Sequence, residues 1–344
     1  MKINIKKNIP LSKLTTFRVG GHAKYYAEVK DKKELMDAIL FAKDKSLPVF
    51  VLGGGSDILL SDEGFKGLVI RYKGKKFSFS EKNGQVLATA GAGLNWDDLV
   101  RASVEKNLQG IECLSGIPGS VGAAPIQNIG AYGQELKDVF IELTAYDIKD
   151  NKFVNLDKKE CEFSYRESIF KKPKNKGRYF ITEIKLQMKK GAKPTITYKS
   201  LKDFIKEKSI KNPSLNQIRA AVLELRGQKL EDPKVLGNAG SFFKNPIVEK
   251  RAVDALLEKY PQMPFYPADG DKYKLFAGWL IDKAGWKGKR VKGAMVSKNN
   301  ALVLTNPEGR ATAKDVRKLS DDIKKDIKAK FGVVLEPEVQ FIGF

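Results

Sequence analysis

Histidine and cysteine are scarce in this sequence of 344 residues. The single histidine, His22, excludes a histidine-rich metal site, and it excludes a Ser-His-Asp triad unless His22 itself is the base. Because His22 follows Gly20 and Gly21, we expect it to lie in a turn. Cys113 and Cys161 are too far apart for a CxxC motif and too few for a disulfide framework. We therefore expect two reduced thiols and no metal site.

Long apolar runs are also missing. No stretch reaches the roughly eighteen apolar residues of a membrane-spanning helix, and the N-terminus MKINIKKNIP lacks the apolar core of a secretory signal. These absences predict a cytoplasmic protein with no membrane partner. The length and a hydrophobic content of 42% allow two or three domains with cores of their own.

The formal charge of +22 raises the possibility of a nucleic-acid partner. The lysines are nevertheless spread along the whole chain and interleaved with acidic residues, whereas a dedicated binder gathers them on one element. The one dense run, KKPKNKG at 171–177, contains Pro173 and Gly177 and is typical of a solvated loop. We therefore expect no nucleic-acid partner, and a basic nucleic-acid binder remains an alternative of a different class.

The hydrophobic periodicity predicts mixed helix and strand content, of the α/β or the α+β class. A helix is expected at LMDAILFAKDK from Leu35, a short buried strand at PVFVLGGG from Pro48, and a helix capped by Asn95 at NWDDLVRASVEKN. Strands are expected at LVIRY, VLATAG, FIELTAYDI and YFITEIKLQM. The pattern predicts a first lobe over residues 1–70 and a sheet-rich second lobe over residues 71–200.

Helices return after about residue 200. Ser214 is expected to cap a helix whose apolar face is Leu215, Ile218, Val222 and Leu225, and further helices are expected near 249–260 and 274–284. The last helix carries the stripe Val316, Leu319, Ile323, Ile327 and Phe331 and ends at Gly332, before a closing strand in VVLEPEVQFIG. Residues 201–344 are thus predicted to form a third, α+β domain.

Three glycine-rich segments are nearly free of charge in a chain that is 30% charged. They are Gly53-Gly54-Gly55-Ser56-Asp57, Ile117-Pro118-Gly119-Ser120-Val121-Gly122-Ala123-Ala124 and Gln127-Asn128-Ile129-Gly130-Ala131-Tyr132-Gly133. Their spacing does not match the Rossmann fingerprint, and each alone is compatible with an ordinary tight turn. Together they favour a bound dinucleotide, because backbone without side chains can approach a diphosphate closely.

Six segments together resemble the UDP-N-acetylenolpyruvoylglucosamine reductase family. They are TTFRVGGHA, LGGGSDILL, IPGSVGAAPIQNIGAYG, SYRESIFK, GNAGSFFKNP and LEPEV, in the order of the family, from Thr15 to Gly343. PTITYKSL and the following helix resemble the longer, type I branch, which has an extra substrate-covering loop. The resemblance implies a two-lobe FAD-binding region of the vanillyl-alcohol-oxidase type and a C-terminal α+β substrate-binding domain.

The resemblance also implies the chemistry. NADPH would pass a hydride to bound FAD, and reduced FAD would pass it to UDP-N-acetylglucosamine enolpyruvate, giving UDP-N-acetylmuramate for peptidoglycan synthesis. The residues implied for FAD are Leu52, Gly53, Gly54, Gly55, Ser56, Asp57, Ile117, Pro118, Gly119, Ser120, Gly122, Gly130, Ala131, Tyr132 and Gly133. Another FAD oxidase or dehydrogenase of the same superfamily, which would share the glycine loops, remains the alternative enzyme.

Three residues are implied as catalytic. Arg166 would hold the substrate carboxylate, Glu338 would support its polarisation, and Ser241 would donate the proton that follows the hydride. The residues alone leave other roles open: an ion pair between Arg166 and Glu167, a structural loop role for Ser241, and Glu336 in place of Glu338.

A further set is implied to contact the UDP-sugar, because cations and amides suit its diphosphate. Its members are Tyr165, Tyr198, Arg226, Lys229, Asn245, Lys274 and Asn300. Lys229 and Lys274 could equally be solvated lysines, like most in this chain. We expect the enzyme to act as a monomer on small molecules.

Overall fold

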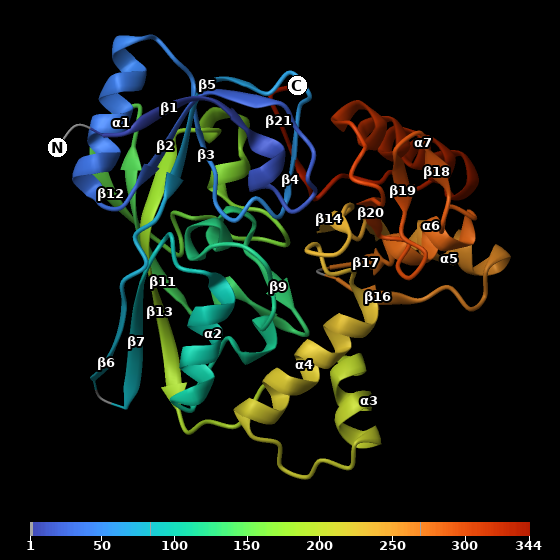
Figure 1. Cartoon of the computed structure of the whole chain (residues 1–344). Coiled ribbons are helices and arrows are strands. Elements are labelled where there is room, and N and C mark those ends of the chain that lie inside the picture. Colours follow the sequence, from blue (N-terminus) through green and yellow to red (C-terminus); the bar gives the residue numbers. More distant parts are fainter. Residues whose placement is uncertain (1–2, 83, 269) are drawn as a thin grey trace. The chain divides into compact units, whose positions relative to one another are not determined.

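The computed structural model describes residues 3–82, 84–268 and 270–344, and it divides into two compact units (Figure 1). The first unit contains the residues up to Ile9 together with Ala23–Gly54 and Lys66–Gln228. The second contains Pro10–His22, Gly55–Phe65 and Lys229–Phe344. The predicted α+β class is confirmed, and the division into lobes at residues 70 and 200 stays a prediction.

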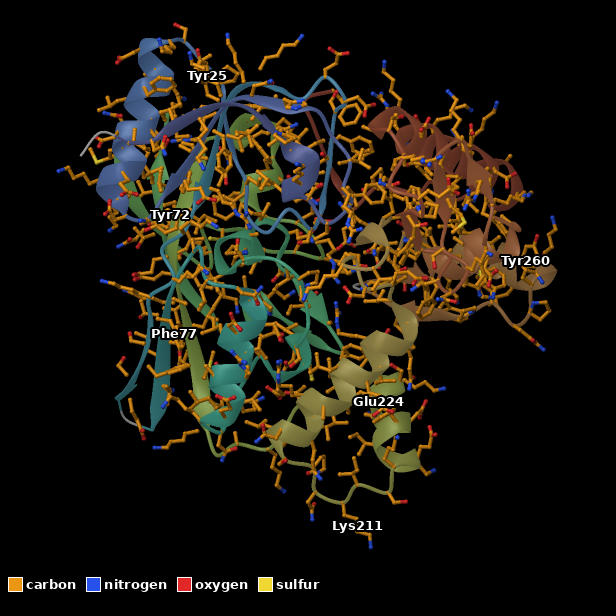
Figure 2. The ribbon with its side chains drawn as sticks, viewed as in Figure 1. Tyr25, Tyr72, Phe77, Lys211, Glu224 and Tyr260 are labelled. Carbon is orange, nitrogen blue, oxygen red and sulfur yellow. The ribbon has the colours of Figure 1, made fainter. Side chains whose placement is uncertain are left out.

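The first unit begins with a small sheet covered by a helix. In spatial order its strands are β1 (Ile5–Pro10), β2 (His22–Val29), β5 (Phe65–Tyr72) and β3 (Val49–Val51), and the helix is α1 (Lys32–Asp44). Helix α1 forms where predicted because Leu35, Ile39 and Ala42 recur on one face and are buried. Tyr72, at the end of β5, packs on the cluster under α1 and also on the core of the larger sheet (Figure 2).

A six-stranded sheet forms the body of the first unit. Its strands run β12 (Lys152–Asp157), β11 (Phe140–Asp147), β13 (Tyr179–Lys190), β7 (Gln85–Gly91) and β6 (Phe77–Lys82), and β8 (Leu108–Gln109) pairs with the end of β13. Helix α2 (Trp96–Glu105) packs on this core through Trp96 and Leu99. The predicted cap is confirmed, because Asn95 Oδ1 accepts from the N–H groups of Asp97 and Asp98.

The same unit ends in a pair of helices, α3 (Lys199–Glu207) and α4 (Leu215–Lys229). Their apolar faces form one cluster, which includes Leu201, Phe204, Ile218 and Val222 and also takes in Cys113. The N-terminus of α4 is capped as predicted, because Ser214 Oγ accepts from the Gln217 N–H at 3.3 Å.

The second unit is built around three small sheets and three helices. The first sheet has the strand order β14 (Gly237–Ser241), β20 (Val303–Asn306), β19 (Ala294–Val296) and β18 (Arg290–Val291). The second has the order β15 (Ile247–Glu249), β17 (Lys272–Leu275) and β16 (Phe265–Pro267). The third pairs β4 (Ile58–Leu60) with β21 (Gln340–Ile342). The helices are α5 (Lys250–Lys259), α6 (Ala277–Lys283) and α7 (Ala313–Phe331). Helix α7 buries its predicted stripe and ends at Gly332, which has φ +68°.

Two local predictions are wrong. His22 begins strand β2 instead of lying in a turn. The closing strand is confined to Gln340–Ile342, where parallel pairing with β4 supplies its hydrogen bonds. In both cases a partner distant in sequence overrides the local signal. The basic run at 171–177 is largely exposed, as predicted for a solvated loop, and it forms short 3-10 turns in which the buried Asn175 amide donates to the Ile169 carbonyl at 3.0 Å.

No helix within the described residues is long and apolar enough to cross a membrane.

Candidate functional site

The first two glycine segments are packed against each other. The chain leaves β3 at Leu52, whose N–H donates to the Ile70 carbonyl at 2.9 Å. A Cβ added at Gly53 would lie 2.9 Å from Ser120 Oγ, and one added at Gly54 would lie 2.6 Å from Gly119 Cα. Gly54 is therefore required for close contact between the two backbones, whereas Gly53 leaves room for the Ser120 side chain.

The second segment is held by backbone bonds to the chain before α2. Val121 N–H donates to Leu94, and Gly122 N–H donates to Ala92, each at 2.9 Å. Within the described part of the chain, the buried side-chain oxygen of Gln127 has no hydrogen-bond partner. A buried acceptor of this kind is costly unless a ligand donates to it. Gln127 begins the third glycine-rich segment, so the structure places this buried acceptor between the second and third segments.

The third segment forms a hairpin. Strand β9 (Gly130–Ala131) pairs with β10 (Gln134–Glu135), and the two residues of the turn, Tyr132 and Gly133, have φ of +47° and +86°. Positive φ at both positions defines the type I′ turn that joins two-residue hairpins. A Cβ at Gly133 would lie 2.2 Å from Thr197 Oγ1, so this position requires glycine for space as well as for conformation.

Arg166 is fixed on this hairpin. Its Nη2 donates to the Gly130 carbonyl at 2.7 Å, and a Cβ at Gly130 would lie 3.0 Å from Nη1. The backbone of Arg166 has φ +56°, a conformation that costs a non-glycine residue about 1 kcal/mol or more. The guanidinium also lies 5.3 Å from the ring centroid of Tyr165. The structure thus brings a predicted catalytic residue onto a predicted flavin segment.

Two predicted substrate residues lie near the same hairpin. The rings of Tyr132 and Tyr198 meet edge to face at 5.7 Å between centroids. A Cβ at Gly116, just before the second glycine segment, would lie 3.2 Å from Arg226 Nε on α4. Burial lowers the pKa of the Arg226 guanidinium and raises the pKa of the Tyr132 hydroxyl. A half-buried cation near the Tyr132 phenol suits an anionic ligand.

Ser241 and Glu338 lie on adjacent segments of the second unit. Ser241 ends β14, and the Glu338 N–H donates to the Phe242 carbonyl at 2.8 Å. Glu336 is the poorer candidate, since its side chain is 72% exposed and its carboxylate lies 3.6 Å from Lys244 Nζ. The half-buried Glu338 is the carboxylate better placed to act on a ligand.

The remaining predicted residues are also in the second unit. Asn300 Nδ2 donates to the Lys229 carbonyl at 3.1 Å, and Asn245 Oδ1 accepts from the Ala277 N–H at 3.1 Å. Lys274 lies in β17, opposite Ile247 of β15. These contacts place Lys229 beside Asn300, and Asn245 just before the strand that pairs with Lys274. Sequence patterns missed Glu231, whose Oε1 accepts from Ser297 Oγ at 2.7 Å and from Asn299 Nδ2 at 2.9 Å.

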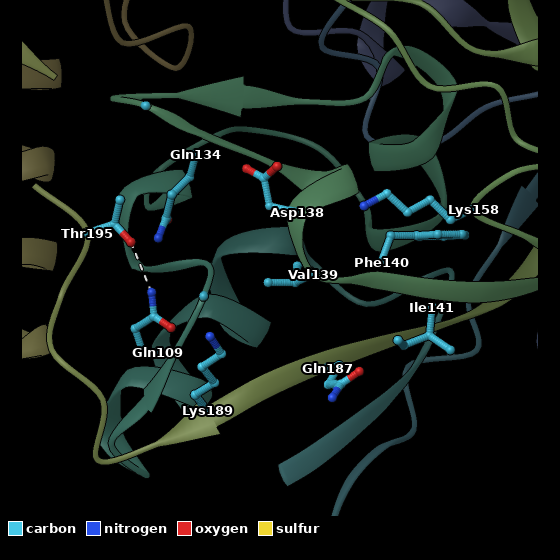
Figure 3. Close-up of a pocket in the computed structure, with 12 residues that line it drawn as sticks. Gln109, Gln134, Asp138, Val139, Phe140, Ile141, Lys158, Gln187, Lys189 and Thr195 are labelled. Carbon is cyan, nitrogen blue, oxygen red and sulfur yellow. Dashed lines mark hydrogen bonds between the residues drawn. The ribbon is translucent and has the colours of Figure 1, made fainter. Parts of the chain in front are cut away.

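Arg166 belongs to the first unit, whereas Ser241 and Glu338 belong to the second. Their convergence on one substrate therefore remains a prediction. A cavity of about 450 Å³ in the first unit does not coincide with the predicted site, because Gly133 is the only predicted residue in its lining (Figure 3). Cys113 and Cys161 are free thiols, as expected, and the structure buries both.

Comparison with known proteins covers nearly the whole chain. The FAD binding domain family matches residues 23–157, and the family described as UDP-N-acetylenolpyruvoylglucosamine reductase, C-terminal domain, matches residues 216–342. A UDP-N-acetylenolpyruvoylglucosamine reductase of Pseudomonas aeruginosa is 40% identical over 340 residues, which cover 98% of this chain and 99% of that protein. The protein of that name from Ralstonia nicotianae is 41% identical over 333 residues and 96% of each chain.

A solved structure agrees over the same span. The crystal structure of UDP-N-acetylenolpyruvylglucosamine reductase from Thermus caldophilus superposes with a TM-score of 0.68 at 27% identity, covering 99% of both chains. The similarity thus covers both units.

Proposed function

Because the chain belongs to the UDP-N-acetylenolpyruvoylglucosamine reductase family, we propose that Arg166, Ser241 and Glu338 carry the reaction of that family in this protein. The enzyme reduces UDP-N-acetylglucosamine enolpyruvate to UDP-N-acetylmuramate in peptidoglycan precursor synthesis, with FAD as its cofactor and NADPH as the hydride donor. When bound, FAD supplies the hydride relay between NADPH and the enolpyruvyl double bond.

The residues proposed to hold FAD fit a flat dinucleotide. Gly53 and Gly54 pack against Ser120 and Gly119 with no room for side chains, which leaves backbone N–H groups to meet a diphosphate. The buried oxygen of Gln127 offers an acceptor for a donor on the cofactor. This cradle supports the assignment of the segments Leu52–Asp57, Ile117–Gly122 and Gly130–Gly133 to the flavin.

Arg166 is proposed to bind the carboxylate of the enolpyruvyl group. Hydride arrival at the distal carbon moves negative charge toward that carboxylate, so a fixed cation stabilises the transition state more than the ground state. Its bond to the Gly130 carbonyl fixes the plane of the guanidinium before substrate arrives. The observation that carries the proposal is this placement of Arg166 on a flavin segment.

Ser241 and Glu338 are proposed to complete the addition. The hydride forms the bond to the distal carbon, and the Ser241 hydroxyl gives its proton to the substituted carbon. Glu338 is proposed to support polarisation of the substrate carboxylate at the same end of the substrate. Its N–H donates to the carbonyl of Phe242, the residue after Ser241. Tyr198 and Arg226 are proposed to hold the UDP portion, with Tyr165, Lys229, Asn245, Lys274 and Asn300 as further contacts.

A paired substitution tests the carboxylate assignment. Glu338→Gln is expected to slow reoxidation of the reduced flavin by the enol ether by about 100-fold, the scale for losing one preorganised group. Glu336→Gln is the matched control, two residues away and exposed, and should stay within about twofold of the parent. Stopped-flow absorbance measures both. Equal rates for the two variants would overturn the assignment of Glu338.

We propose further that the enzyme works in the cytoplasm, where nucleotide sugars and NADPH are found, and as a monomer. Size-exclusion chromatography with light scattering of the flavin-loaded protein tests the monomeric state, and a mass of twice 38.4 kDa would contradict it.

A further inference from the structure

Thr195 is fixed by side chains through all of its polar groups. Its N–H donates to Glu112 Oε1 at 3.0 Å, its carbonyl accepts from the Cys113 thiol at 3.3 Å, and its Oγ1 accepts from Gln109 Nε2 at 2.9 Å (Figure 3). Thr195 lies in an extended segment with no regular secondary structure. Three side-chain bonds on one residue of such a segment indicate a fixed point of the chain.

Glu112 is the most constrained of these partners. It begins the short helix η2 (Glu112–Leu114), and it is fully buried. Its second oxygen, Oε2, accepts from the Gly110 N–H at 2.8 Å. Both carboxylate oxygens therefore act as acceptors of backbone N–H groups. The proposed mechanism gives this buried acid no role.

The same short helix also holds the flavin hairpin. The Cys113 N–H donates to Gln134 Oε1 at 2.8 Å, and Gln134, in β10, is buried. Gln134 directly follows the turn of Tyr132 and Gly133. Helix η2 is therefore bonded both to the hairpin that carries Tyr132 and to the segment that carries Tyr198.

Tyr198 follows Thr195 by three residues, and the segment between them lies against the hairpin. Thr197 Oγ1 occupies the space that a side chain at Gly133 would need, and the Tyr198 ring meets the Tyr132 ring. Helix α3 starts at the next residue, Lys199. The position of the Tyr198 ring thus depends on where Thr195 is fixed.

We propose that Glu112 is a positioning residue that sets Tyr198 against the flavin hairpin through the backbone of Thr195. This proposal rests on the proposed function, in which Tyr198 contacts the UDP-sugar. Glu112 itself touches neither substrate nor flavin in this account, and its effect passes through one hydrogen bond to a segment 83 residues away in sequence.

Hydrogen exchange tests the positioning step without activity. Glu112→Ala removes the acceptor from both the Thr195 and the Gly110 N–H groups, whereas Glu112→Gln would keep an oxygen for one of them. In Glu112→Ala we expect the Thr195 amide of the flavin-loaded protein to exchange at least about tenfold faster. Asp147→Asn is the control for a buried carboxylate elsewhere in the same unit, since Asp147 accepts from the N–H groups of Lys149 and Asp150 and also from the Arg178 guanidinium. Unchanged exchange at Thr195 in Glu112→Ala would overturn the proposal.

A double-mutant cycle tests the consequence for substrate. Glu112→Ala is expected to raise KM for the UDP-sugar by about tenfold in the parent, and by less than about twofold in a Tyr198→Ala background. Asp147→Asn should leave KM within about twofold in both. If Glu112→Ala folds poorly, Thr195→Val, which removes the hydroxyl bonded to Gln109, should show the same non-additivity. Additive effects of Glu112→Ala and Tyr198→Ala would overturn the proposal.

Failure of the Glu112 proposal and failure of the proposed function would give different results. If Tyr198→Ala alone leaves KM unchanged, the substrate role of Tyr198 in the proposed function is wrong, and so is the kinetic half of this proposal. The exchange rate of the Thr195 amide would still decide whether Glu112 fixes the segment. If Tyr198→Ala raises KM and Glu112→Ala does not, only the role of Glu112 is wrong.

Discussion

Asp97 joins the second glycine segment to helix α4, so its replacement by asparagine should weaken both. Asp97 Oδ1 accepts from the Gly116 N–H at 2.7 Å and from Arg219 Nη1 at 2.6 Å, and Oδ2 accepts from Arg219 Nη2 at 2.7 Å. Gly116 leads into the segment proposed for FAD, and Arg219 precedes Arg226 on the same helix. One carboxylate therefore holds two parts of the proposed site.

The size of the expected loss of stability follows from the burial of the ion pair between Asp97 and Arg219. Arg219 is 13% exposed and Asp97 is 32% exposed, so the pair lies between a surface salt bridge and a buried one. Asp97→Asn keeps the volume but leaves the Arg219 cation without its counter-charge. We expect a loss of about 2 kcal/mol in the free energy of unfolding. Asp98→Asn is the control, because Asp98 and its partner Arg101 are both more than half exposed, and it should lose less than about 0.5 kcal/mol.

The stabilisation that Asp97 contributes should decrease as the pH falls. Burial alone would raise the pKa of Asp97, but the hydrogen bonds from Arg219 and from the Gly116 N–H outweigh it and hold the pKa below its ordinary value. A carboxyl whose pKa is lowered by folding stabilises the fold above its unfolded pKa of about 3.9 and loses that contribution as pH falls through the folded pKa. The gap between parent and Asp97→Asn should therefore close as pH falls below about 4.

Urea unfolding of the parent, Asp97→Asn and Asp98→Asn, followed by circular dichroism at pH 7 and at pH 3.5, measures these differences. The flavin-loaded and flavin-free proteins are compared, and the loss of flavin affinity is expected in Asp97→Asn alone. Equal stability of the two variants at pH 7, or a gap that widens on acidification, would refute the reasoning.

Three further results are expected. Ser241→Ala should leave reduction of the flavin by NADPH largely intact and slow reoxidation of the flavin by the enol ether by at least about 100-fold. Stopped-flow absorbance measures both half-reactions, and an equal loss in the two would rule out Ser241 as the proton donor. Gly54→Ala places a methyl group 2.6 Å from Gly119 Cα, so the purified variant should carry much less FAD than the parent. A ratio of flavin absorbance to protein absorbance equal to that of the parent would show that the contact can relax. Burial raises the pKa of Cys161 to about 12 and also raises that of Cys113, so neither thiol should react with a thiol reagent at pH 8 until the protein unfolds; fast labelling of the native protein would contradict the buried placement.

Local sequence signals were sufficient to predict the helices that have a capping residue or one apolar face. Helix α2 begins after Asn95 because that side chain accepts from the first free N–H groups of the helix. Helix α7 follows from a stripe of apolar residues and ends at Gly332, where a left-handed conformation is needed. The glycine segments were visible as well, since uncharged glycine runs are rare in a chain this rich in charge.

Contacts between residues far apart in sequence were not predictable in the same way. The bond between Arg166 and Gly130 spans 36 residues, and the one between Glu112 and Thr195 spans 83. Neither pair has a periodic or capping signal, because the geometry depends on how the hairpin and the extended segment dock. The roles of Arg166, Ser241 and Glu338 came from family resemblance, and the structure adds the contacts that fix the first and bring the other two onto adjacent segments.

The most direct test is a two-step titration of the purified protein without oxygen, followed at the flavin band near ~450 nm. NADPH is added first, and UDP-N-acetylglucosamine enolpyruvate is added after the band has bleached. Recovery of the band with formation of one UDP-N-acetylmuramate per flavin is the result predicted here. Bleaching that only oxygen reverses would instead indicate another flavoenzyme of the superfamily, and a colourless protein that cannot be loaded with FAD would contradict the account altogether.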